Sequence, residues 1–158
     1  MPIDAARFFF NLREPNSHFD FDLDLAVSES SNNPVYYVQY AYARICSIIR
    51  NLESQGVELS RPTDEELSLL KEKEERELIL YLSALTDEII QSAKTYDSAR
   101  ITHYAVELAT KFHKFYAVCR VKDIDKPLQN ARAALCKDVA TVLKNILTML
   151  KITAPEKM

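Results

Sequence analysis

The chain is organised around twelve residues near its front, Asn33-Pro34-Val35-Tyr36-Tyr37-Val38-Gln39-Tyr40-Ala41-Tyr42-Ala43-Arg44. Asn33 and Pro34 predict a helix start, because Asn caps free backbone N–H groups and Pro suits the first turn. At about 100° per residue, one arc gathers apolar side chains and predicts the core face: Val38, Ala41, Tyr42, Ile45, Ile48, Ile49 and Leu52. Gly56 is the only glycine of the chain and predicts the helix end, since glycine accepts the left-handed conformation found there.

A second stripe lies beside that core face and consists of Tyr37, Tyr40 and Arg44. Two phenol rings and a guanidinium group can stack on bases and hold phosphate. The same spacing is typical of tyrosines packed at a core edge with a solvated arginine next to them, and from spacing alone packing is the commoner explanation. The pattern by itself leaves both interpretations open.

The composition of the 158 residues, with one Gly and no Trp, narrows the fold class. Tight β-turns, phosphate loops and dinucleotide folds depend on glycine and are nearly excluded. A hydrophobic fraction of 47% with 27% charged residues is that of a folded domain. We therefore predict one all-α domain, an antiparallel helical bundle with a short N-terminal appendage.

Charge is divided unevenly along the chain. Residues 1–93 hold 8 Lys/Arg and 17 Asp/Glu, whereas residues 94–158 hold 12 and 6. A basic second part can face phosphate. Charges also scatter over any helical surface, so this asymmetry permits a polyanionic partner without requiring one.

No catalytic or metal-binding constellation is evident. Cys46, Cys119 and Cys136 form no CxxC pair and predict buried, reduced thiols in a cytoplasmic protein. His103 and His113 belong to no HExxH or Cys/His cluster, so we expect surface or partly packed side chains. There is no signal peptide and no apolar run long enough for a bilayer, so no membrane association is expected.

The N-terminal residues predict two further elements. Pro2 and Asp4 indicate a helix start, and the Phe8-Phe9-Phe10 run requires a packing partner. Residues 19–25 alternate apolar and acidic side chains and predict a short half-buried strand, with an extended linker as the alternative. The acidic spacing lacks the Gly and Glu of an EF-hand loop, so calcium is not expected. We place a boundary in the polar residues 28–33.

The remaining elements are helical. Thr63 and Glu66 form a capping box ahead of a short helix through Leu70, and the charged run 71–77 predicts a solvated face at the start of a longer helix that breaks near Ser83. Asp97 caps a helix over 98–121, which carries Tyr116 on the rim of its core face. Pro127 opens the last helix, whose apolar stripe is interrupted by Arg132, and Pro155 is expected to end it.

Several segments, in order along the chain, resemble arginyl-tRNA synthetases where the catalytic core meets the anticodon-binding domain. The most specific is Tyr37-Val38-Gln39-Tyr40-Ala41-Tyr42-Ala43-Arg44. The others are Asp4-Ala5-Ala6-Arg7-Phe8-Phe9-Phe10, Asp20-Phe21-Asp22-Leu23-Asp24-Leu25-Ala26, Leu108-Ala109-Thr110-Lys111-Phe112-His113-Lys114-Phe115-Tyr116 and Ala154-Pro155-Glu156-Lys157-Met158.

The resemblance implies a DALR-type anticodon-binding bundle over 34–158, preceded in 1–33 by the end of a catalytic region. It implies a parent enzyme, a monomer, that ligates arginine to its tRNA with ATP and magnesium. This chain lacks the HIGH-type and KMSK-type signatures. We therefore expect no cofactor and no adenylate formation here, and arginine-dependent pyrophosphate exchange would contradict that.

The resemblance also implies anticodon contacts at Tyr37, Tyr40, Arg44, Tyr116 and Met158, with an arginine-accepting tRNA as the partner. Position 42 is often His in such sequences and is Tyr here. The alternatives are the anticodon-binding bundle of another synthetase, such as a glycyl β subunit or a cysteinyl enzyme, or a protein-interaction bundle. Residues 1–33 can fold back, mediate a dimer or be swapped between chains.

Overall fold

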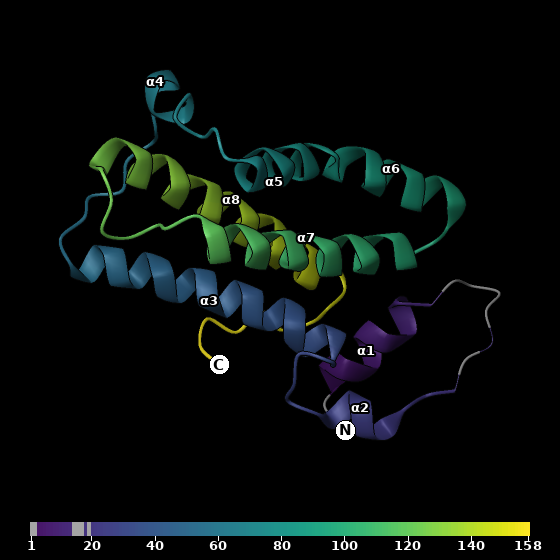
Figure 1. Cartoon of the computed structure of the whole chain (residues 1–158). Coiled ribbons are helices and arrows are strands. Elements are labelled where there is room, and N and C mark those ends of the chain that lie inside the picture. Colours follow the sequence, from purple (N-terminus) through teal and green to yellow (C-terminus); the bar gives the residue numbers. More distant parts are fainter. Residues whose placement is uncertain (1–2, 14–17, 19) are drawn as a thin grey trace.

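The computed structural model describes residues 3–13, 18 and 20–158 and contains eight helices and no strand within these ranges. Figure 1 shows their arrangement. The helices are α1 (Ile3–Asn11), α2 (Leu23–Val27), α3 (Pro34–Ser54), α4 (Asp64–Leu67), α5 (Lys73–Ser83), α6 (Leu85–Thr95), α7 (Ala99–Val118) and α8 (Lys126–Met149). The predicted all-α class is confirmed.

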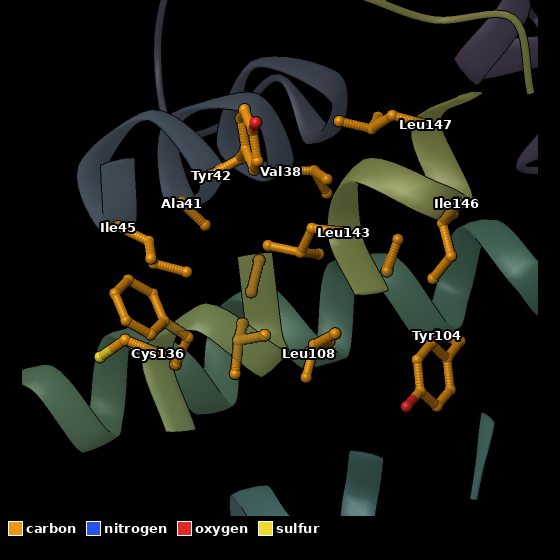
Figure 2. Packing of buried hydrophobic residues seen from close by; sticks show 14 of the residues in the cluster. Val38, Ala41, Tyr42, Ile45, Tyr104, Leu108, Cys136, Leu143, Ile146 and Leu147 are labelled. Atoms are coloured by element: carbon orange, nitrogen blue, oxygen red, sulfur yellow. The ribbon is translucent and has the colours of Figure 1, made fainter. Parts of the chain in front are cut away.

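The three long helices α3, α7 and α8 pack against one another and enclose the core. Helices α5 and α6 lie along α7, α4 lies on α8, and α1 packs on α3 and α7 (Figure 1). The predicted arc of α3 points into this core, where Val38, Ala41 and Ile45 are fully buried against α7 and α8 (Figure 2). Burial of one such large apolar side chain stabilises the fold by about 1.5–3 kcal/mol, so this face fixes α3 in the bundle.

The predicted helix signals are confirmed in their local geometry. The Asn33 side chain accepts a hydrogen bond from the Val35 N–H at 3.2 Å, and Gly56 follows α3 with φ of 74°. The capping box closes with Thr63 N–H donating to Glu66 at 2.8 Å and Glu66 N–H donating to Thr63 at 3.3 Å. The predicted break at Ser83 separates α5 from α6.

The predicted strand over 19–25 is wrong. Residues 23–27 form the helix α2, because the Asp22 side chain caps it by accepting the Leu25 N–H at 2.9 Å. Ala26 is buried in that helix. A cap and one buried contact thus outweigh the alternating pattern. Phe19, the first residue of the predicted strand, and Pro2 of the predicted helix start lie outside the described residues.

The last helix does not extend to Pro155. It ends at Met149, and Lys151 takes a left-handed conformation with φ of 57° while the Ile152 N–H donates to the Leu147 carbonyl at 2.8 Å. Such a pairing satisfies the free carbonyl groups of a helix end. Helix α7 likewise ends earlier than predicted, at Val118 rather than residue 121, and Cys119 after it is extended.

The charged run 71–77 is only partly solvated. Lys73 and Glu77 form the expected exposed pair at 3.6 Å. Glu75, however, is fully buried, and its Oε1 accepts a hydrogen bond from Arg132 Nε at 2.6 Å. Arg132 Nη1 also donates to the Arg120 carbonyl at 2.8 Å. The arginine that interrupts the stripe of α8 therefore neutralises a buried carboxylate of α5.

The three cysteines are free thiols. Burial raises the pKa of the Cys119 thiol to about 11 and that of Cys136 to about 12, so both stay protonated near neutral pH. Cys46 is only half-buried, contrary to the prediction for all three. No helix among the described residues is both long and apolar enough to cross a membrane.

Candidate nucleic-acid interface

Tyr40, Arg44 and Tyr116 form one cluster across α3 and α7. Arg44 Nη1 donates a hydrogen bond to the Tyr40 hydroxyl at 2.5 Å. The Arg44 guanidinium carbon lies 5.7 Å from the centre of the Tyr40 ring and 4.7 Å from that of Tyr116. At such distances a cation is attracted to the ring face. The two rings and the hydrogen bond therefore fix the guanidinium of a half-buried arginine at the rim.

A hollow of about 520 Å³ opens beside this cluster and is called the tail hollow here. Its lining comes from α3, α7 and the end of the chain: Tyr40, Ala43, Arg44, Ser47, Ile48, Arg50, Asn51, Tyr116, Glu156, Lys157 and Met158. Four of the five predicted site residues thus surround one space. They come from three segments that are far apart in the sequence.

Met158 reaches the hollow because residues 151–158, the C-terminal tail, fold back along α3 (Figure 1). Ile152 anchors the start of the tail in the core, with 5% of its surface exposed. Gln39 Nε2 donates to the Thr153 carbonyl at 2.8 Å, and Arg50 Nη2 donates to the Glu156 carbonyl at 2.9 Å. These two contacts, about three turns apart on α3, lay the tail along that helix.

Tyr37 does not line the tail hollow. Its ring lies 4.9 Å from that of His113, between centres, and lines a second space of about 390 Å³, called the aromatic hollow. That hollow is lined by Glu29, Ser30, Ser31, Tyr36, Tyr37, Tyr40 and His113. Tyr40 lines both hollows, so the predicted stripe forms two adjoining sites.

His113 is a residue of this interface that the sequence analysis did not assign to it. Its ring lies 5.8 Å from the Tyr40 ring in a stacked arrangement, and its Nε2 is buried with no hydrogen-bond partner in the described part of the chain. Burial and the nearby Arg44 lower the pKa of the imidazole, which favours its neutral form. Two signals could have placed it there: its spacing of three residues from Tyr116 on α7, and its position inside the family-like segment 108–116.

A basic groove of about 430 Å³ adjoins the tail hollow and shares Arg50 and Glu156 with it. Tyr42, Ile45, Cys46 and Ile49 from α3 and Lys137, Ala140, Thr141 and Lys144 from α8 complete its lining. Lys137 and Lys144 are exposed, and no ion pair engages either within the ranges that the structure describes. Two cations are thus available to an anion.

The chemistry of this region suits recognition of a nucleic acid. Its side chains offer aromatic faces, a fixed guanidinium and free ammonium groups. Flat bases stack on such rings, and phosphate pairs with such cations. Across the described residues, no three His, Cys, Asp or Glu side chains are placed to hold a metal ion.

Comparisons with known proteins also point to a nucleic-acid-binding domain. The family model described as "DALR anticodon binding domain" matches residues 38–158. Arginine–tRNA ligases of Caldanaerobacter subterraneus and Acetivibrio thermocellus are 54% and 52% identical to the chain over 98% of its length. The chain spans about 28% of the length of these relatives.

Solved structures agree in fold. The Thermus thermophilus arginyl-tRNA synthetase matches 99% of this chain with 26% of its own, at a TM-score of 0.84 and 28% identity. A Plasmodium falciparum arginyl-tRNA synthetase matches 99% of this chain with 27% of its own, at a TM-score of 0.84 and 26% identity.

Proposed function

The chain belongs to the DALR anticodon-binding domain family, and on that basis we propose that it recognises the anticodon loop of an arginine-accepting tRNA. The observation that carries the proposal is the tail hollow, where Tyr40, Arg44, Tyr116 and Met158 line one space. Single-stranded loop bases are the part of an RNA that a protein can splay out and read by stacking and hydrogen bonds.

Each residue has a distinct role in this proposal. Tyr40 and Tyr116 supply stacking faces, each at about 1–3 kcal/mol per base. Arg44 donates to a base edge or a phosphate, and its position is set before binding by the Tyr40 hydroxyl. Met158 provides an apolar contact at the wall of the hollow. Tyr37 serves a neighbouring base in the aromatic hollow, beside His113.

The basic groove extends the interface to the RNA backbone. It borders the tail hollow at Arg50, so a strand whose base enters the hollow can continue over Arg50 to Lys137 and Lys144. Phosphate contacts of this kind position an RNA without reading its sequence.

We further propose that the chain acts within an arginine–tRNA ligase, a monomeric cytoplasmic enzyme that uses ATP and magnesium. Residues 34–158 then form the anticodon-binding module and residues 1–33 the end of the catalytic region. In this proposal the ligation step belongs to other parts of the parent enzyme. We expect no arginine-dependent pyrophosphate exchange by the 158-residue chain.

Binding of RNA hairpins to Tyr40 and Arg44 variants tests the proposal. Tyr40→Ala and Arg44→Ala should each weaken binding of a hairpin with an arginine anticodon by about tenfold or more, because each removes a stacking or charged contact. Tyr96→Ala, which replaces an exposed tyrosine at the end of α6, is the matched control and should leave affinity unchanged. If Tyr40→Ala and Arg44→Ala bind the hairpin as the unmodified chain does while remaining folded, the tail hollow is not the RNA site. In that case a protein-interaction role gains support.

A further inference from the structure

The C-terminal tail is held from one side by α3 and from the other by the N-terminal helix α1. Asp4 Oδ2 accepts a hydrogen bond from the Thr153 N–H at 3.1 Å and lies 3.4 Å from Gln39 Nε2. Arg7 Nη1 donates to the Lys151 carbonyl at 2.6 Å. The bonds from Asp4 and Arg7 to the tail join residues separated by more than a hundred positions in the chain.

Asp4 and Gln39 enclose a single backbone unit of the tail. Gln39 donates to the carbonyl of Thr153, and Asp4 accepts the N–H of the same residue. Both polar backbone groups of Thr153 are therefore paired, and the one residue is tied to both α1 and α3. Arg7 adds a bond two residues earlier, where Lys151 turns the chain with φ of 57°.

The attachment lies close to the proposed binding site. Only four residues separate Thr153 from Met158, and both Lys157 and Met158 line the tail hollow. Between Thr153 and Met158, Arg50 holds the tail by its hydrogen bond to the Glu156 carbonyl. The place where α1 fixes Thr153 thus determines where Lys157 and Met158 can lie.

We propose that Asp4, with Arg7 and Gln39, is a positioning residue for RNA recognition, because it fixes the C-terminal tail that forms one wall of the tail hollow. This inference rests on the proposed function for its effect on RNA binding. Helix α1 then does more than cover the core with Phe8 and Phe9, since it also links the N-terminal residues to the binding site. A displacement of α1 would leave the tail attached only through α3 and the buried Ile152.

The first test needs no RNA. The methyl signal of isotope-labelled Met158 should report the nearby Tyr40 and Tyr116 rings in the unmodified chain. In Asp4→Ala it should shift towards the position of a free peptide, because the tail loses one of its attachments. Met149 is exposed on α8 outside the tail and should not change. An unchanged Met158 signal in folded Asp4→Ala and Gln39→Ala variants would overturn the proposal.

The second test is a double-mutant cycle with a hairpin carrying an arginine anticodon. Asp4→Ala and deletion of Lys157 and Met158 should each weaken binding about three- to tenfold, and the combination should be no weaker than the deletion alone. If the affinity losses of the two variants multiply in the combined variant, Asp4 acts independently of the tail and the proposal fails.

Two variants serve as controls. Asp4→Asn keeps an acceptor oxygen and should restore most of the affinity. Asp87→Ala removes the same charge from the first turn of α6, away from the tail, and should have no effect. If the unmodified chain does not distinguish the hairpin from one with a scrambled loop, the proposed function fails, whereas the methionine measurement still decides whether α1 fixes the tail.

Discussion

The buried pair of Glu75 and Arg132 shows how one residue contact can determine local structure. Glu75 is completely buried and depends on Arg132 as its charged partner, at 2.6 Å. The charged run 71–77 predicted a solvated position for Glu75, and Arg132 interrupts the apolar stripe of the last helix, so neither residue alone indicated its partner. Only the packing of α5 on α8 makes them partners.

Removal of the arginine alone should lower the stability of the fold much more than removal of both members of the pair. We predict that Arg132→Ala lowers the free energy of unfolding by about 3–5 kcal/mol, because it leaves a charge buried without a partner. Replacement of both, Glu75→Leu with Arg132→Met, should be close to neutral or stabilising. Urea unfolding measures both, and a decrease below about 1 kcal/mol for Arg132→Ala would contradict the prediction.

His113 gives the fold a pH dependence. Burial and Arg44 lower the pKa of the folded imidazole relative to the ordinary value, so the unfolded chain takes up the proton more readily. The stability gained from the neutral ring is therefore complete above the unfolded pKa of about 6.5 and declines as the pH falls below it.

We predict that acidification from about pH 7 to about pH 5 destabilises the unmodified chain more than the His113→Gln variant. Thermal melts of both proteins across this range measure the difference. Equal pH dependence of the two melting temperatures would show that His113 does not contribute.

Among the elements, the helix ends show which sequence signals predict the start or end of a helix correctly. Asn33 with Pro34, Gly56 and the Thr63–Glu66 box each act through hydrogen bonds or backbone angles within a few residues. They are therefore visible in the sequence. Gly56 follows α3 with φ of 74° and Tyr96 ends α6 with φ of 54°. Both helix ends therefore need a left-handed residue, but one position carries glycine and the other a tyrosine, whose Cβ disfavours that conformation.

This contrast predicts opposite effects of substitution. Gly56→Ala should cost about 1 kcal/mol through backbone strain alone, since the added Cβ would meet nothing within 4 Å. Tyr96→Gly should gain a similar amount, because the Tyr96 side chain is 90% exposed and contributes little packing. Thermal unfolding of both variants provides the measurement. A decrease in the stability of Tyr96→Gly would contradict the argument.

Elements that depend on distant contacts were less predictable. The alternating residues 19–25 indicated a strand, but a short alternation carries less information than the Asp22 cap and the burial of Ala26 on the bundle. The core face of α3 and the rim residues Tyr40 and Arg44 were predictable, because both follow from helical periodicity. The partners of that rim, His113 and the tail hollow, required the packing of α7 and the returning tail.

For the molecule as a whole, the proposed function divides the interface into base-reading and backbone contacts. We predict that Lys137→Ala with Lys144→Ala weakens binding of arginine-anticodon and scrambled hairpins by the same factor. The slope of log affinity against log salt should also fall by about 0.7–0.9 for each phosphate that no longer pairs with a lysine. Lys94→Ala, on the exposed end of α6, is the matched control. A change in the ratio between the two hairpins would place these lysines among the base-reading residues.

The most direct test of the central claim is a salt-dependent titration of the unmodified chain with these two hairpins. Recognition of the anticodon predicts tighter binding of the arginine-anticodon hairpin at every salt concentration, by about tenfold or more, with similar salt slopes for both RNAs. Equal affinities that fall together with salt would show only a nonspecific basic surface and would contradict the claim.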